Sequence, residues 1–346
     1  MERIHLALAS SCVALLVAGC GGGDGYSATS SGTTIPTAAV QITPTNAPAV
    51  AKGAVTPAQG MVKTGSGQAG VVGVVAQASG RSRTVLDISL TEFNRARGLK
   101  FPPVVAGAVA SFSLNCTTSG TVSVSFQDTN SIGTFDVGDI MTMAFNNCVE
   151  PDPVTGNLST SNGSAIFAIT SASGALGMGI TPFSAAFTLT FSNFTSRDNA
   201  TGLTDSINGD IGFVISDDGT NTTGTMSGTS LRMDSSADGA FLMTYYSISF
   251  TEANVPTTAT PYSFSVNMTI ASTVANGSVT VATTTPFTGQ GDGDPTAGVM
   301  VITGANNSTL TLTALPDGVH VQMVVDEDGA GGSSPVSLTD TTWTAI

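Results

Sequence analysis

Apolar and polar side chains alternate with a period of two through most of the chain after residue 104. Clear examples are residues 112–116, 122–126 and 262–270, where mainly serine and threonine separate the larger apolar residues. Alternation of this kind is typical of antiparallel strands that bury one face and expose the other. The pattern predicts about a dozen strands between residues 101 and 346.

Asparagine–glycine and aspartate–glycine dipeptides punctuate these runs. Such pairs supply the positive φ angles that tight hairpins need. They are Asn162-Gly163, Asn208-Gly209, Asp218-Gly219, Asp238-Gly239, Asn276-Gly277 and Asp317-Gly318. We therefore expect residues 101–346 to form one acidic all-β domain, an antiparallel β-meander that either closes as a barrel or folds into a two-sheet sandwich.

The first 19 residues have the layout of a secretory signal peptide, with Arg3, an apolar run over residues 4–17 and small residues before Cys20. The stretch 16–19, Leu-Val-Ala-Gly, resembles the lipobox of bacterial lipoproteins. That resemblance implies cleavage before Cys20 and attachment of lipid to this cysteine. Because Gly21 rather than aspartate follows, the resemblance implies a lipid-anchored protein of the outer membrane, and the side that the domain faces stays open.

Residues 20–80 are rich in glycine, serine, threonine, alanine and proline and poor in aromatic residues. Because such a segment offers little apolar surface to bury, we expect a flexible tether there. Residues 81–100 are basic, and three of their apolar residues share one helical face, which predicts a short helix. A strand over residues 84–90 is the alternative.

Charge is divided unevenly along the chain. The whole sequence has 24 acidic and 10 basic residues, a formal net charge of −14. From Phe101 onward the only lysine or arginine residues are Arg197 and Arg232, so the β domain is strongly acidic, whereas residues 21–100 are basic. Nucleic acid is therefore excluded as a partner of the β domain, because nothing there neutralises phosphates. The acidic surface fits solubility, divalent-cation binding, or docking of the basic segment 81–100.

Cys116 and Cys148 are the cysteines that remain once the signal region and Cys20 are set aside. In an exported protein such a pair predicts a disulfide. Closing a loop of about 33 residues would stabilise the fold by roughly 3–4 kcal/mol. A metal site on the two thiolates is the weaker alternative, because the only histidine after the signal region is His320.

Motifs for catalysis are missing from the sequence. His320 lies on the polar face of a predicted strand, where a surface role is more common than a catalytic one. The chain contains no Gly-x-Ser-x-Gly elbow, no glycine-rich phosphate loop with a lysine and no His-Glu-x-x-His helix. Paired carboxylates acting on glycans remain open, although the chain has few aromatic residues to hold a sugar.

Residues 128–139 have nearly the spacing of a calcium-binding loop. The residues that match calcium-ligand positions are Asp128, Asn130, Thr134, Asp136 and Asp139. Ile132 stands where another oxygen ligand belongs, and predicted strands rather than helices flank the loop. A second acidic stretch offers Asp326 and Asp328 but has Ala330 at the corresponding position. Calcium bound with low affinity is the cofactor that these loops predict, and plain acidic turns are the alternative.

Several stretches together resemble a group of uncharacterised proteobacterial lipoproteins: residues 116–149, residues 285–315, the VVDEDG motif and the closing Thr-Thr-Trp. The resemblance covers most of residues 105–346. It implies that acidic-loop positions of the group fall on Asp128, Asn130, Gly133, Asp139, Asp326, Asp328 and Gly331, and that Ile132 and Ala330 weaken calcium binding here. It implies no activity, because the function of that group is itself unknown.

These observations predict a lipid-anchored protein whose β domain is non-enzymatic and serves as a structural, adhesive or ligand-binding module. Its expected partners are the membrane, through the N-terminal lipid, and a surface glycan, a protein or a divalent cation. Two other classes stay open. One is a hydrolase that acts on glycans through aspartates such as Asp128, Asp136 and Asp139. The other is a carrier of lipid or another hydrophobic ligand in an apolar cavity.

Overall fold

The computed structural model describes residues 32–67, 88, 95, 109–129, 136–151, 156–174, 182–254, 260–291, 293–329 and 335–346. The chain divides into two compact units, Met1–Gly32 and Thr33–Ile346. Nearly all described residues belong to the second unit. The predicted signal peptide and the predicted lipidation site Cys20 lie outside the described residues.

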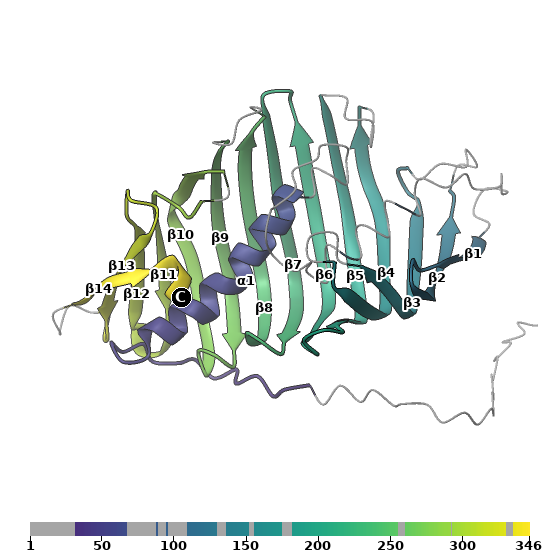
Figure 1. The fold of residues 1–346 in the computed structure, drawn as a ribbon. Coiled ribbons are helices and arrows are strands. Elements are labelled where there is room, and N and C mark those ends of the chain that lie inside the picture. Colours follow the sequence, from purple (N-terminus) through teal and green to yellow (C-terminus); the bar gives the residue numbers. More distant parts are fainter. Residues whose placement is uncertain are drawn as a thin grey trace, which may run out of the picture. The chain divides into compact units, whose positions relative to one another are not determined.

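The second unit is built on one antiparallel sheet in which each strand pairs with its neighbours in the sequence (Figure 1). The strands are β1 (Val109–Asn115), β2 (Ser119–Gln127), β3 (Ile140–Pro151), β4 (Leu158–Ser173), β5 (Phe183–Asp198), β6 (Thr204–Asp217), β7 (Asn221–Ser235), β8 (Gly239–Ala253), β9 (Pro261–Ser272), β10 (Gly277–Gln290), β11 (Ala297–Thr303), β12 (Thr309–Ala314), β13 (His320–Asp326) and β14 (Val336–Thr342). Short 3-10 helices occupy Ala305–Asn307 and Trp343–Ala345. The predicted antiparallel meander is confirmed.

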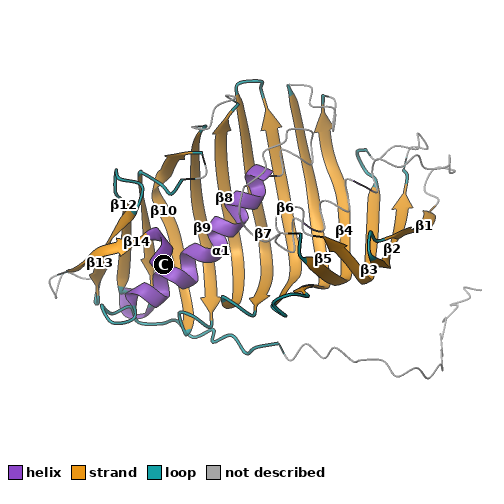
Figure 2. Cartoon of the chain, viewed as in Figure 1, coloured by secondary structure: helices purple, strands orange, loops and turns teal. Residues whose placement is uncertain are grey.

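The described strands form a single open sheet, with β1 and β14 at its two edges. The sequence had led us to expect a closed barrel or a two-sheet sandwich. The described strands form neither. Part of one face of the sheet is covered by a helix instead of by further strands: α1 (Ala47–Gly67) packs against β7, β8, β9 and β12 (Figure 2). Alternation with period two predicts that one face is buried, but it does not predict what buries it.

The start of α1 is stabilised by Thr43 and Asn46. The Thr43 amide donates to Asn46 Oδ1 over 2.8 Å, and the Asn46 amide donates to Thr43 Oγ1 over 3.4 Å, a reciprocal arrangement of the capping-box type. Small apolar side chains then recur on the side that faces the sheet, namely Ala47, Val50, Ala51, Ala54, Val55, Ala58 and Met61. Gly53 permits close contact, because a Cβ there would lie 2.5 Å from Ser272 Oγ.

Residues 33–67 are thus ordered, which corrects the expectation of a flexible tether for this part of residues 20–80. Upstream of α1, the Val40 amide donates to the Ser278 carbonyl over 3.1 Å, and the Ile42 amide donates to Ser308 Oγ over 2.9 Å. The expectation rested on the scarcity of large side chains. Alanine and valine at helical spacing bury enough surface when the helix can approach the sheet this closely. Residues 68–80 lie outside the described residues.

Ile88 and Arg95 are the residues of the predicted basic helix 81–100 that the structure describes. Both have helical backbone conformation, and Ile88 is buried in the main hydrophobic core. The extent of the helix stays a prediction, because the residues around these two lie outside the described residues.

Two of the predicted turns lie inside strands. Asn162-Gly163 is in β4 and Asn208-Gly209 is in β6. Gly163 and Gly209 have φ angles of 102° and 124°, but they lie opposite β-bulges of the neighbouring strands, where the pairing register shifts. Bulges and hairpin turns both use positive φ, so the dipeptides indicate the backbone conformation but not its place in the fold. The other four dipeptides lie at strand connections, as predicted.

The bulges continue as a row across neighbouring strands. Asn147 in β3, Asn193 in β5 and Tyr245 in β8 have φ angles of 46°, 48° and 47°, and the register shifts at each of them. The spacing from Asn147 to Asn193 equals that from Gly163 to Gly209, so the strand pairs β3–β4 and β5–β6 repeat one design. Because each bulge bends its strand and increases its twist, the row bends the sheet along one line.

Candidate functional site

The two faces of the sheet differ in chemistry. The inner face, defined here as the face that packs against α1, carries the buried apolar residues of the main core. The outer face carries mainly serine, threonine and asparagine. One outer-face row has a hydroxyl on seven successive strands, paired from strand to strand: Ser173, Ser184, Ser216, Thr223, Thr251, Ser263 and Thr288.

The predicted disulfide between Cys116 and Cys148 is confirmed, with 5.5 Å between the two Cα atoms. It ties the residue after β1 to β3, across the intervening strand β2. Glu150 lies beside the two cysteines. Since both sulfurs are bonded to each other, the cluster of Cys116, Cys148 and Glu150 offers no thiolate to a metal.

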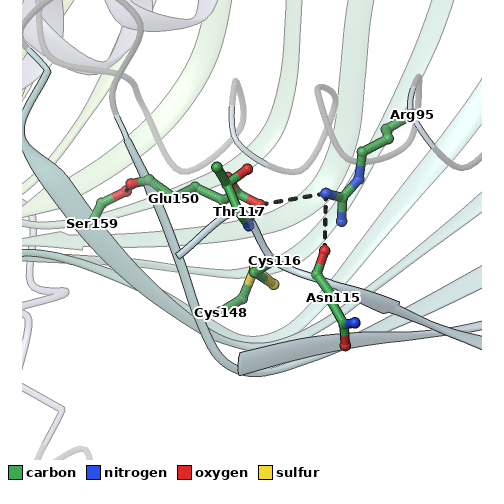
Figure 3. A network of polar contacts seen from close by, with 7 residues as sticks. All are labelled: Arg95, Asn115, Cys116, Thr117, Cys148, Glu150 and Ser159. Carbon is green, nitrogen blue, oxygen red and sulfur yellow. Dashed lines mark hydrogen bonds and ion pairs between the residues drawn. A yellow bond between two sulfur atoms is a disulfide. The ribbon is translucent and has the colours of Figure 1, made fainter. Parts of the chain in front are cut away.

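Glu150 instead connects the disulfide region to Arg95 (Figure 3). Its Oε1 accepts from the Thr117 amide over 2.9 Å and from Arg95 Nη1 over 3.5 Å. Arg95 Nη1 also donates to the Asn115 carbonyl over 3.3 Å. This ion pair joins a residue of the basic segment 81–100 to the acidic sheet. Docking of this segment on the acidic domain is one of the possibilities that the uneven charge distribution suggests. We assign the network a structural role.

The first acidic loop is closed by hydrogen bonds of its own. Asp128 and Asp139 are fully buried. Asp139 Oδ1 accepts from the amide and the hydroxyl of Thr129, over 2.7 and 2.9 Å, and its Oδ2 accepts from the Asp136 amide over 3.0 Å. Both carboxylate oxygens therefore already bind donors of the loop. Asn130 and Thr134 lie outside the described residues, and the calcium site stays a prediction.

The second acidic loop, after β13, has a similar internal arrangement. Asp326 Oδ1 accepts from the amides of Asp328 and Gly329, over 3.3 and 3.0 Å. Such a pattern is typical of an aspartate that stabilises a turn. Ala330 lies outside the described residues, so here too the metal site stays a prediction.

His320 and Asp317 form an exposed pair at the turn between β12 and β13. His320 Nδ1 lies 2.6 Å from Asp317 Oδ2. Hydrogen bonds from the amides of His320 and Val319 hold the pKa of Asp317 down at about 2. The pair closes a turn at the surface, the setting that the sequence predicted for His320.

Asp217 is a buried carboxylate that the sequence analysis missed. It is 2% exposed, and both of its oxygens accept from Asn254 Nδ2, over 2.9 and 2.8 Å. The Gly219 amide and the Thr222 hydroxyl donate to it as well, over 2.7 and 2.9 Å. These donors join the β6–β7 turn to the residue that follows β8, so this carboxylate too has a structural role.

An exposed aromatic residue stands out on the outer face. Tyr245 is 82% exposed, whereas its neighbour Tyr246 is 2% exposed. The Tyr246 hydroxyl donates to the Asp210 carbonyl over 2.7 Å, and burial, followed by the nearby Asp210 charge, raises the pKa of this tyrosine. Tyr246 thus anchors the bulge of β8 from the inner face while Tyr245 projects outward.

The sequence does contain a signal for this bulge. Phe241 and Met243 are buried at odd positions, but Tyr246, Ile248 and Phe250 are buried at even positions. The apolar alternation therefore changes phase between the two tyrosines, which is what an extra residue in the strand produces. Sequence analysis that counts alternating residues without tracking their phase misses it.

Within the described residues, no helix combines the length and the apolar character needed to cross a membrane. No protein-family model matches the chain, and neither a curated protein sequence nor a solved structure matches it.

Proposed function

We propose that the protein is a lipid-anchored, non-enzymatic binding module that uses the outer face of its open sheet. One observation carries the proposal: the inner face is packed against the chain's own helix, whereas the outer face presents hydroxyl and amide side chains across many strands. A broad, polar and largely rigid surface suits the binding of an extended ligand better than the conversion of a small one.

A hydrolase has less support, because several of the described carboxylates are engaged by the protein itself. Asp139, Asp217 and Asp317 each accept hydrogen bonds from backbone amides. A general acid and a general base must instead reach the substrate. The binding role therefore fits the acidic residues better than an aspartate-dependent reaction does.

A carrier of hydrophobic ligands has less support as well. The apolar side chains of the inner face and those of α1 belong to one continuous core. A ligand would have to displace α1 from the sheet, together with the hydrogen bonds that hold residues 40 and 42.

The proposed lipid on Cys20 would keep the sheet near the membrane. The folded unit begins at Thr33, and a fully extended chain from Cys20 to this residue spans at most about 45 Å. Because α1 belongs to the folded unit, this fully extended length is far shorter than the fully extended length of the 60-residue chain that the composition predicts to be flexible.

The experiment uses the full-length protein purified in detergent. It is incubated with bacterial envelope fractions and with an immobilised panel of neutral and charged polysaccharides, and both retention and product release are measured. We expect retention on at least one of these materials without chemical change in it. Release of oligosaccharide that disappears in Asp136→Ala would overturn the binding role and support the hydrolase.

A further inference from the structure

Tyr245 combines two features that rarely occur together. It is the most exposed large apolar or aromatic residue among those described, and its φ of 47° lies in the left-handed region. Bulky side chains are uncommon there, because the Cβ crowds the backbone. The equivalent bulges of β3 and β5 have asparagine, Asn147 and Asn193, which tolerates this conformation well. Backbone strain of this kind tends to be kept where a side chain has a task.

Tyr245 has polar, neutral side chains among its neighbours on β7, β8 and β9. Ser227, Ser247 and Asn267 are exposed beside it, paired in one row across β7, β8 and β9. The nearest arginine of the outer face, Arg232, is neutralised by Asp234, to which its Nε and Nη2 donate over 2.7 Å each. An anionic polymer would find no free positive charge on this arginine.

The described N-terminal residues Thr33 and Ile35 contact the outer face near one end of β8. Ile35 covers Ala240, Ala271 and Leu242 on the outer face, and Arg232 Nη2 donates to the Thr33 carbonyl over 2.7 Å. Apolar residues a few positions away in β8 are therefore covered, while the ring of Tyr245 is left in solvent.

We propose that Tyr245 is the stacking platform of a binding site for a neutral glycan chain, with Ser227, Ser247 and Asn267 as hydrogen-bonding neighbours. A pyranose ring has an apolar C–H face that packs on an aromatic ring and hydroxyl edges that pair with hydroxyl and amide groups. Neighbouring strands lie about 4.8 Å apart, close to the length of one sugar in an extended β-linked chain. Successive sugars would lie above β7, β8 and β9. The inference rests on the proposed binding role of the outer face and names its ligand class and its central residue.

Saturation-transfer NMR on the full-length protein in detergent tests the site, with cellotetraose and chitotetraose as neutral probes. We expect transfer to the ring C–H protons of at least one tetraose. Tyr245→Phe should bind within about threefold of the wild type, and Tyr245→Ala should bind about tenfold more weakly. Val214→Ala is the matched control, because Val214 is also exposed on the outer face, at 59%, but lies away from the bulge.

Tyr245→Asn separates a binding role from a structural one. Asparagine suits the left-handed backbone, so this variant should keep or raise the melting temperature while it loses tetraose binding. A lower melting temperature together with unchanged binding would mean that Tyr245 serves the fold, which would overturn the inference.

Two further outcomes would overturn the glycan site. Equal tetraose binding by the wild type and Tyr245→Ala is one. The other is a wild type that ignores both tetraoses and is retained on envelope fractions through a protease-sensitive component, which would identify a protein partner. In both cases retention by envelope material persists, so the general binding role survives. Loss of all retention would remove that role as well.

Discussion

Two asparagine–glycine pairs, Asn162-Gly163 and Asn276-Gly277, show how one dipeptide serves two purposes in this sheet. In the turn between β9 and β10, Asn276 takes the left-handed conformation, with φ of 54°, and Gly277 begins the next strand. Inside β4 the roles are exchanged, because Gly163 has the positive φ of 102°. There Asn162 Oδ1 accepts from the Asn147 amide of the neighbouring strand over 2.8 Å.

The comparison shows that tertiary contacts confine both glycines. Neighbouring strands crowd Gly163 at the bulge, and the N-terminal segment crowds Gly277 at the turn, where a Cβ would lie 2.7 Å from the Ala38 carbonyl oxygen. At the bulge, a Cβ on Gly163 would lie 2.3 Å from the Asn193 carbonyl oxygen of β5. Gly209 has the same relation to the Ser230 carbonyl oxygen, again at 2.3 Å. The strands approach so closely at the bulge row that glycine is required there for space as well as for conformation.

Replacing a bulge glycine should have the largest effect. Gly163→Ala and Gly209→Ala each combine a left-handed backbone with a clash against a neighbouring carbonyl, and we expect a loss of about 4 kcal/mol in unfolding free energy. Gly156→Ala is the control, because Gly156 has φ of 72° with nothing within 4 Å of its Cβ position; it should lose about 1–2 kcal/mol. Urea denaturation measures all three, and equal losses would contradict the role of close approach.

Removal of the disulfide should cause the next largest loss of unfolding free energy. Cys148 directly follows the bulge residue Asn147, so the bond secures the end of the bulge row to β1. We expect Cys116→Ser combined with Cys148→Ser to lose roughly 3 kcal/mol. Denaturation of the wild type under reducing conditions is the control and should reach the same stability. An unchanged urea midpoint in the double variant would show that the bulge row holds without the covalent bond.

Replacement by glycine should change the stability differently at Asn162 and at Asn276. Asn162→Gly removes the acceptor of the Asn147 amide and should cost about 1 kcal/mol. Asn276→Gly should change stability by less than about 0.5 kcal/mol, since glycine readily takes the left-handed conformation. Thermal unfolding of both variants measures the difference. Similar losses would mean that the turn, too, depends on its asparagine side chain.

Lowering the pH should reduce the stability that the turn at Asp317 contributes, but not the stability that the bulge contributes. We expect this to be the smallest of the effects. The pKa of Asp317 is lowered from 3.8 to about 2 by the amides of His320 and Val319. Because a lowered pKa favours the ionised folded state, this stabilisation is present above pH 3.8 and is lost as the pH falls through about 2. Asp317→Asn should therefore flatten the stability curve in that range, as followed by urea denaturation at each pH.

A bulge variant is the comparison for the acid experiment. Asn162 does not titrate, so Asn162→Ala should lose the same free energy at each pH between 2 and 4. A loss that grew or shrank over this range would show that the bulge is coupled to a titrating group.

The candidate site was predicted in part. The acidic loops were visible in the sequence, yet hydrogen bonds from Thr129 and Asp136 now occupy both oxygens of Asp139, a proposed ligand. Spacing along the chain cannot show which donors the folded loop turns toward a carboxylate. Tyr245 was missed for a related reason: strand alternation assigns adjacent tyrosines to opposite faces but needs the bulge to decide which one is exposed.

Sequence reasoning alone predicts the antiparallel strands, their order along the chain and the disulfide between Cys116 and Cys148. These follow from local preferences, from the period of apolar residues and from the chemistry of an exported cysteine pair. Three features emerge only from the folded chain: the sheet stays open, residues 33–67 pack on it, and two asparagine–glycine pairs lie at bulges instead of in turns. These outcomes have the same physical cause, because each depends on which surfaces pack together in the folded chain. Small residues such as Ala54 and Gly53 matter because they allow another surface to pack closely against them.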